Sequence, residues 1–232
     1  MRFPVAAAVL GTTPLGPYAV VRVAGEHLEV GSPGQFAMVL DPAGAGYLPR
    51  PVGLFRAGDG EVSMLVDPSH RVGGLGSARE LQVLGPLGCG FSLDGADAAS
   101  TLLVAGGIGI TVFPGVPALL GGRPRLVAGF RLPEQAAATA LVDAHVQVAL
   151  APSSVLDLID LDGVRLVLAS GPAGLVHAVA ARCATAGVAC QVATRHRWDA
   201  GSGRATAVRS RSMGRRSASA SRARSSTRHG SG

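Results

Sequence analysis

The amino-acid sequence predicts a small antiparallel β-barrel, then a doubly wound parallel sheet, then a tail that belongs to neither. Three observations lead to this prediction. Short β-rich runs broken by Gly and Pro fill the amino-terminal part, apolar strands alternate with helical segments in the middle, and periodicity stops after Ala193. We therefore expect a barrel over residues 1–97, an α/β domain over residues 98–193 and a disordered tail over residues 194–232.

The barrel prediction depends on the spacing of short apolar runs, because no helical period occurs among them. Turn residues separate these runs at the short, regular intervals that are typical of a small closed antiparallel sheet. We expect strands at residues 5–10, 18–23, 35–40, 52–56, 61–66 and 81–84.

The middle of the chain has the rhythm of a parallel sheet covered by helices on both faces. Residues 101–105 form a continuous apolar run, which indicates a strand buried on both sides. Pro172 is expected to be the first residue of a helix and Gly187 its stop signal. Further strands are expected at 125–129, 146–150, 165–169 and 188–193, with helices at 133–142, 153–159 and 172–186.

The charge of the chain is divided unevenly between its body and its tail. All 21 basic Lys or Arg side chains are Arg, and ten of them lie in residues 194–232 beside a single acid, Asp199, which gives the tail +9. Residues 1–193 hold eleven arginines and fourteen acids, which gives −3. The body therefore offers no electrostatic reason to bind nucleic acid. No apolar run is long enough to span a membrane, and the start does not resemble a signal peptide, so we expect a cytoplasmic protein.

The three cysteines, Cys89, Cys183 and Cys190, form no CxxC pair. Their spacing therefore predicts neither a disulfide framework nor a metal site, and we expect three buried free thiols.

Two glycine-bearing turns follow predicted strands of the sheet. Gly106-Gly107-Ile108-Gly109 comes after the first strand, and Ser170-Gly171-Pro172 comes after the fourth. Ligands of open α/β sheets bind outside the carboxyl ends of the strands, so both turns fall at the edge where a nucleotide would bind. Ordinary tight connections also use glycine, and the first turn lacks the full G-x-G-x-x-G pattern, so this alternative stays open.

Two features of the barrel could contact phosphate. Arg50 stands between Pro49 and Pro51 at the start of a predicted strand, where a guanidinium suits bidentate phosphate contact, although a lone Arg is usually a solvated surface charge. The loop that contains Gly73 and Gly74 could lie against a pyrophosphate or be merely flexible.

In this order, these motifs resemble the ferredoxin reductase-like flavoproteins and, more narrowly, the electron-transfer subunit of bacterial dihydroorotate dehydrogenase. The resemblance covers residues 5–193. The matching words are Pro33-Gly34-Gln35-Phe36, Arg50-Pro51-Val52-Gly53, Gly85-Pro86-Leu87-Gly88-Cys89-Gly90-Phe91, Gly106-Gly107-Ile108-Gly109-Ile110, Gly129-Phe130-Arg131 and Ser170-Gly171-Pro172.

The resemblance implies an FAD-binding barrel, an NAD-binding sheet domain and a catalytic partner subunit that oxidises dihydroorotate in pyrimidine biosynthesis. It assigns no catalytic residue to this chain, and it leaves NADP open because of the Arg123-Pro124-Arg125 cluster. The residues implied at FAD are Arg50, Pro51, Val52, Gly53, Val66, Asp67, Gly73 and Gly74, and those implied at NAD are Gly106, Gly107, Gly109, Ser170, Gly171 and Pro172.

The sequence departs from this family in several places. Gly53 stands where the family has Ser, and Ser170 stands where it has Cys. The family continues past its last strand into a cysteine-rich stretch that holds a 2Fe–2S cluster, whereas residues 197–208 contain no cysteine, so the ligands are missing.

A shift of reading frame between about Ala193 and Trp198 would account for the missing cysteines. In the shifted frame the codons of Ala200, Ala205 and Val208 all permit Cys at the family's spacing. Two other interpretations stay open: a related NAD(P)H–flavin oxidoreductase subunit that serves another partner, and a non-catalytic frameshifted product.

Overall fold

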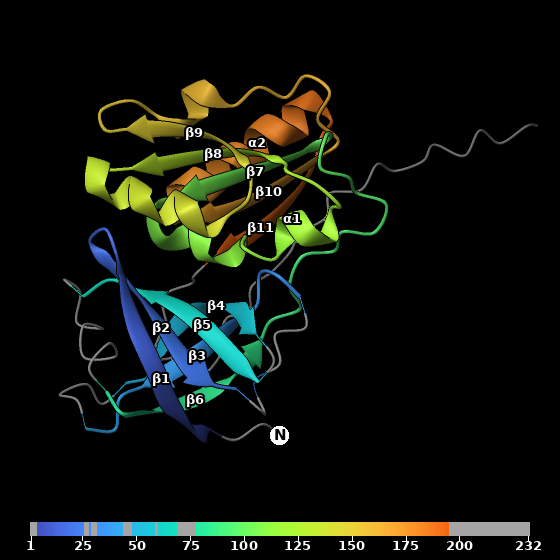
Figure 1. Ribbon diagram of the computed structural model, residues 1–232. Helices are drawn as coiled ribbons and strands as arrows, with labels where there is room; N and C mark the ends of the chain where they lie inside the picture. Colours follow the sequence, from blue (N-terminus) through green and yellow to red (C-terminus); the bar gives the residue numbers. More distant parts are fainter. Residues whose placement is uncertain are drawn as a thin grey trace, which may run out of the picture.

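The six amino-terminal strands close into an antiparallel barrel in a computed structural model of the chain (Figure 1). The structure describes residues 4–25, 28, 32–43, 48–58, 60–68 and 78–194. The predicted tail and the loop with Gly73 and Gly74 lie outside the described residues. The barrel strands are β1 (Val5–Leu15), β2 (Tyr18–Ala24), β3 (Phe36–Leu40), β4 (Arg50–Gly58), β5 (Glu61–Val66) and β6 (Glu80–Leu87), in the order β1-β2-β5-β4-β3-β6.

Strand β1 closes the barrel because it pairs with two neighbours in succession. Residues 5–8 pair with β6, and residues 9–15 pair with β2, with a shift of register between Val9 and Gly11. Alternate side chains of the strands point inward and form an apolar core of fourteen buried residues, which includes Val21, Met64 and Leu81.

The second half of the chain is a five-stranded parallel sheet in the order β11-β10-β7-β8-β9 (Figure 1). All six residues of the central strand β7 are buried, because helices cover both faces of the sheet. The strands are β7 (Thr101–Gly106), β8 (Arg125–Phe130), β9 (His145–Leu150), β10 (Leu166–Gly171) and β11 (Ala189–Thr194). The predicted fold class, an antiparallel barrel followed by a parallel nucleotide-binding type of sheet, is confirmed for the described residues.

The helical connections are shorter and tighter than the sequence predicts. Only α2 (Ala173–Ala186) is a long α-helix, and it ends at Gly187 in the left-handed conformation, as expected. Pro172 is its N-cap rather than its first residue. The predicted helices at 133–142 and 153–159 are the 3-10 helices η3 (Pro133–Leu141) and η4 (Val155–Leu158), and the turn after β7 leads into η2 (Gly107–Val112) and the short α1 (Val116–Leu119).

One apolar cluster joins the barrel to the sheet. It contains Tyr18, Phe55 and Leu65 from barrel strands together with Ile110 and Phe113 from the segment after β7. Phe91, from the linker between the two sheets, stacks on Phe113 with ring centroids 5.9 Å apart. The two halves therefore share buried surface, and their relative position is fixed by packing.

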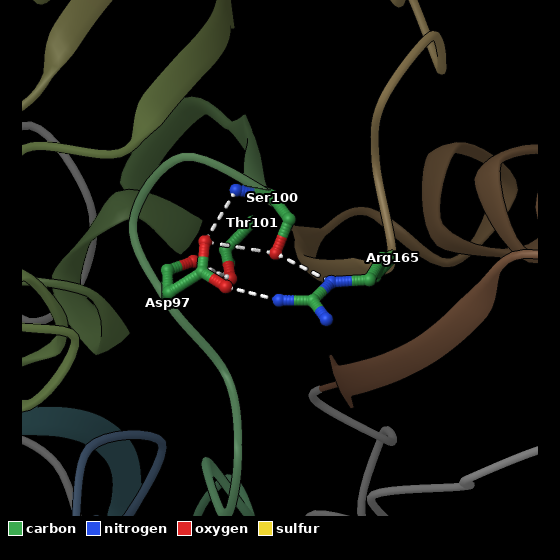
Figure 2. A network of polar contacts seen from close by, with 4 residues as sticks. All are labelled: Asp97, Ser100, Thr101 and Arg165. Atoms are coloured by element: carbon green, nitrogen blue, oxygen red, sulfur yellow. Dashed lines mark hydrogen bonds and ion pairs between the residues drawn. The ribbon is translucent and has the colours of Figure 1, made fainter.

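A polar network fastens the linker at the amino ends of β7 and β10 (Figure 2). The Asp97 carboxylate accepts hydrogen bonds from the Ser100 backbone N–H at 2.8 Å and from its hydroxyl at 2.9 Å, and it is paired with the Arg165 guanidinium. The Thr101 hydroxyl donates to the Asp97 carbonyl at 2.7 Å. These contacts hold the start of β7 beside the start of β10.

The expectation of three buried thiols is wrong for one cysteine. Cys183 and Cys190 are buried between α2 and β11, whereas Cys89 is exposed in the linker after β6.

Candidate functional site

The two predicted glycine turns lie side by side at the carboxyl edge of the sheet. They meet because β7 and β10 are parallel neighbours, with Ala105 opposite Ser170 in the register. A Cβ on Gly109 would lie 2.7 Å from the Ser170 carbonyl oxygen and 2.8 Å from the Gly171 Cα. A Cβ on Gly171 would lie 2.9 Å from the Gly106 Cα. These three glycines therefore allow the two turns to pack backbone against backbone.

Gly107 is a glycine for a different reason. Its φ of +53° lies in the left-handed region, and nothing lies within 4 Å of the place where a Cβ would be. Its backbone is therefore uncrowded on the side where a Cβ would lie, which leaves room for a flat ring or a phosphate to approach.

The amino end of α2 lies at the same edge of the sheet, directly after Ser170-Gly171-Pro172. The helix has fourteen residues, and its first turn holds no acidic side chain that would compensate the positive end of the helix dipole. Ser170 is buried, Gly171 is partly buried and Pro172 is exposed. This end of the sheet therefore favours an anionic group.

The predicted barrel residues gather at one end of two neighbouring strands. The antiparallel register pairs Leu54 with Met64, so the start of β4, at Arg50–Gly53, lies beside the end of β5. Val66 is the last residue of β5, and Asp67 comes directly after it. Arg50 and Pro51 are partly buried, and Val52 is buried. Among the described residues the Arg50 guanidinium has no hydrogen-bond or ion-pair partner, so it is available to a ligand. Gly73 and Gly74 cannot be placed, since they lie outside the described residues.

The barrel end and the sheet edge meet at Gly53. This buried glycine of β4 lies against Thr111 and Val112 of η2, the helix that begins at Gly107. The start of β4 and the end of η2, the helix that follows the first glycine turn, are thus in direct contact, although the sequence separates them by more than fifty residues.

Tyr18 belongs to this region and was missed by the sequence analysis. Its side chain is buried at the junction of barrel and sheet, where burial raises the pKa of its phenol and the nearby Asp67 carboxylate raises it further. The sequence does show that Tyr18 begins a strand directly after the Gly16-Pro17 turn. That position did not mark it as a site residue, because a Tyr at the start of a strand usually belongs to a hydrophobic core.

Comparison with solved structures identifies this architecture. An NADH-dependent reduced ferredoxin–NADP oxidoreductase, studied for flavin-based electron bifurcation, matches at a TM-score of 0.65 and 19% identity, over 86% of this chain and 79% of its own. The ferredoxin reductase of carbazole 1,9a-dioxygenase matches at 0.67 and 18%, over 84% of this chain and 69% of its own. Phthalate dioxygenase reductase matches at 0.56 and 16%, over 82% and 68%.

The chain has the fold of these ferredoxin reductases. Identities below 20% establish the shared fold, and what each reductase binds is a property of that protein. No known protein-family model matches the chain, and no curated protein matches it.

The ferredoxin reductase fold in this chain carries few ionisable groups at the junction. No cluster of three or more His, Cys, Asp or Glu side chains that could hold a metal ion occurs within the described residues. None of the helices in that part of the chain is long and apolar enough to cross a membrane. Among the described residues, the junction consists mainly of backbone and apolar side chains together with the Tyr18 phenol. The Arg50 guanidinium and the Asp67 carboxylate lie at the adjoining end of the barrel, and the amino end of α2 lies at the sheet edge.

Proposed function

We propose that this chain is an FAD-dependent, NAD-linked oxidoreductase subunit that passes electrons between a nicotinamide and a flavin. The observation that carries the proposal is the contact between the start of β4 and η2, the helix that follows the glycine turn at the carboxyl edge of the sheet. A flavin held along β4 and a nicotinamide held at the turn would meet there. The matched reductases include proteins described as acting with NADH, NADP and pyridine nucleotides.

The residues of the barrel fit an FAD. Arg50 offers an unpaired guanidinium to a phosphate, and Pro51 fixes the backbone beside it. Val52, Gly53, Val66 and Asp67 lie at the same end of the barrel. Within the described residues, the proposed FAD site therefore comprises Arg50, Pro51, Val52, Gly53, Val66 and Asp67.

The residues of the sheet edge fit a nicotinamide dinucleotide. Gly107 leaves open space for a close approach, and the amino end of α2 favours a pyrophosphate. Gly106, Gly109 and Gly171 contribute by keeping the two turns in contact, and Ser170 and Pro172 complete the second turn. Titration of the purified chain with NADH and with NADPH compares the two dissociation constants and shows which dinucleotide is preferred.

When bound, a flavin supplies the hydride and single-electron chemistry, and the protein supplies position and environment. Apolar side chains of the shared cluster, Leu65, Ile110 and Phe113 among them, exclude water from the junction. Arg50 offsets the negative charge of a phosphate.

The test is the visible absorption spectrum of the purified 232-residue chain, recorded before and after anaerobic addition of NADH. We expect a flavin spectrum that bleaches with NADH. A colourless protein that stays colourless when FAD is added would contradict the proposal, and would favour the non-catalytic frameshifted product.

Arg50→Ala gives the matched test of the FAD site. Loss of a charge-assisted contact to phosphate should weaken FAD binding by about 10- to 100-fold. Arg22→Ala is the control, because Arg22 also lies on a barrel strand but is paired with Glu61 at 3.1 Å on the outer wall. An equal loss in both variants would contradict a role for Arg50 at the cofactor.

We propose further that the partner is the catalytic subunit of a dihydroorotate dehydrogenase, which places the chain in pyrimidine biosynthesis. The motif order from Pro33 to Pro172 supports this, and the solved structures support only the broader class. The missing cluster cysteines predict that electrons stop at the flavin.

Mixing with a purified bacterial catalytic subunit tests the partner. We expect the two chains to co-elute from a sizing column, with no turnover of dihydroorotate and NAD. A flavin that bleaches with NADH in a chain that does not co-elute would favour a reductase for another partner.

A further inference from the structure

Gly53 lacks a side chain because Thr111 occupies its space. A Cβ built on Gly53 would lie 3.2 Å from the Thr111 Cβ and 3.6 Å from the Val112 Cγ1, and closer to the Thr111 hydroxyl than two non-bonded atoms can approach. Gly53 has no positive φ, so the backbone itself does not require glycine there. The close approach of η2 is the reason for this residue.

Thr111 is held firmly in this place. Its side chain is 1% exposed, and its hydroxyl donates to the Ile108 carbonyl oxygen at 3.0 Å, which fixes its rotamer. Ile110 and Val112 on either side are also buried. The contact is therefore a rigid one. The space left by the missing side chain of Gly53, here called the barrel notch, is filled by the Thr111 side chain of η2.

We propose that Thr111, seated on Gly53, is a positioning residue that sets the distance between the barrel strand and the glycine turn. This inference rests on the proposed function, in which β4 holds the flavin and the turn at Gly107 holds the nicotinamide. Thr111 touches neither cofactor in this scheme. It acts through the backbone of β4 and through η2, the short helix that carries both Gly107 and Thr111.

The consequence for the reaction follows from geometry. Hydride transfer needs reacting atoms about 3–3.5 Å apart, and a misplacement of about 1 Å can slow such a step by about 100-fold. A Cβ at position 53 would have to push η2 away from β4, because both neighbours are buried and cannot swing aside. The residues proposed to hold NADH would be unchanged, and the distance between the cofactors would increase.

Gly53→Ala should therefore lower the rate constant of flavin reduction by NADH by about 10- to 100-fold. Because Gly53 belongs to the proposed FAD site, the affinity argument uses Thr111→Gly, which alters neither set of binding residues: we expect its dissociation constants for FAD and for NADH to change by less than about 3-fold while its rate of flavin reduction falls. The double variant Gly53→Ala with Thr111→Gly should recover most of the lost rate, because removal of the Thr side chain frees the space that the new Cβ needs. Stopped-flow absorbance measures the rate, and titration measures the two constants.

Two further variants test the positioning role of Thr111 even if Gly53→Ala does not fold. Thr111→Ser keeps the hydroxyl and the Cβ and should reduce flavin at the wild-type rate, whereas Thr111→Gly empties the notch and should slow it. Thr139→Gly is the matched control, because the Thr139 hydroxyl makes the same bond inside a 3-10 helix, to the Ala136 carbonyl oxygen at 2.8 Å, away from the barrel notch.

The outcomes separate the inference from the function on which it rests. A Thr111→Gly variant whose rate falls only together with its FAD affinity, or a double variant that recovers nothing, would overturn the positioning role of Thr111. A wild-type chain that binds no flavin would instead overturn the proposed function. The contact between Gly53 and Thr111 would then be tested by the free energy of unfolding of the cofactor-free chain. Gly53→Ala should lower that free energy, and the double variant Gly53→Ala with Thr111→Gly should recover most of the loss.

Discussion

The two edges of the parallel sheet are built from different chemistry. At the amino edge, charged and hydroxyl side chains fasten the strands: Asp97, Ser100 and Arg165 form one network (Figure 2), and Arg125 pairs with Asp160 at 3.5 Å. At the carboxyl edge, Gly106, Gly109 and Gly171 bring backbone against backbone, and no charged side chain lies between the two turns.

This difference follows from what each edge must do. A ligand of an open α/β sheet binds at the carboxyl edge, so the residues of that edge have small side chains or none. Close packing of the two backbone turns holds this edge together. The amino edge lies at the opposite end of the strands and uses side chains as fasteners. Damage to the carboxyl edge should therefore affect both stability and the cofactor response, whereas damage to the amino edge should affect stability alone.

Gly109→Ala should break the carboxyl edge and give the largest effect. The new Cβ would meet the Ser170 carbonyl oxygen at 2.7 Å and the Gly171 Cα at 2.8 Å, and backbone atoms cannot rotate aside. We expect a loss of about 3 kcal/mol in the free energy of unfolding, measured by urea denaturation, and loss of flavin reduction by NADH.

Gly174→Ala serves as the control for this substitution. Gly174 lies in the first turn of α2, and nothing lies within 4 Å of its Cβ position. Alanine there should leave the free energy of unfolding unchanged or raise it by up to about 1 kcal/mol. Equal destabilisation by both substitutions would mean that close packing of the two turns is not what the glycines provide.

Gln191→Ala should have the next largest effect, on the connection between barrel and sheet. The buried Gln191 amide accepts from the Ser92 backbone N–H at 2.9 Å and donates to the Ser92 carbonyl at 2.6 Å. Its loss leaves two backbone groups of the linker without these partners, which should cost about 2 kcal/mol in the free energy of unfolding.

Gln191→Glu tests whether the donor half of this contact matters. A carboxylate can still accept from Ser92 but cannot donate to its carbonyl, so the variant should be destabilised at neutral pH and should recover as the carboxyl group becomes protonated at low pH. A Glu variant as stable as wild type at neutral pH would contradict this account.

The elements of the fold were largely predictable because each depends on local sequence. In the described part of the chain, apolar runs bounded by Gly and Pro located the eleven strands, and Gly187 located the end of α2. The exceptions were the connections after β8 and β9, where the expected helices are the 3-10 helices η3 and η4. The Ala-rich residues 133–141 favour an α-helix, yet they form a 3-10 helix with bonds such as Val142 N–H to the Thr139 carbonyl oxygen. Propensity is weak in a nine-residue segment, and packing against the sheet overrides it.

The sequence named candidate residues for the site but not their contacts. Position after a strand marked Gly107 and Gly109 as candidates, and only the structure shows that Gly107 adopts the left-handed conformation whereas Gly109 must lack a Cβ. The partners of Gly53 and Gly109 are Thr111 and Ser170, which lie about sixty residues along the chain, and no local pattern indicates such contacts. The same limit explains why Tyr18 was missed.

Asp97→Ala should give the smallest effect, and one that depends on pH. The hydrogen bond from the Ser100 backbone N–H lowers the pKa of Asp97 below its usual value, and the Ser100 hydroxyl and the Arg165 charge lower it further. A carboxyl group whose pKa is lower in the folded chain contributes stability that is present above its unfolded pKa and is lost as the pH falls through its folded value. Wild type should therefore exceed the variant in thermal midpoint at neutral pH, and the difference should shrink as the pH falls below about 4. Because Asp97 is at the amino edge, flavin reduction by NADH should stay unchanged at neutral pH. A variant that keeps its stability but loses that reaction would contradict the division of roles between the two edges.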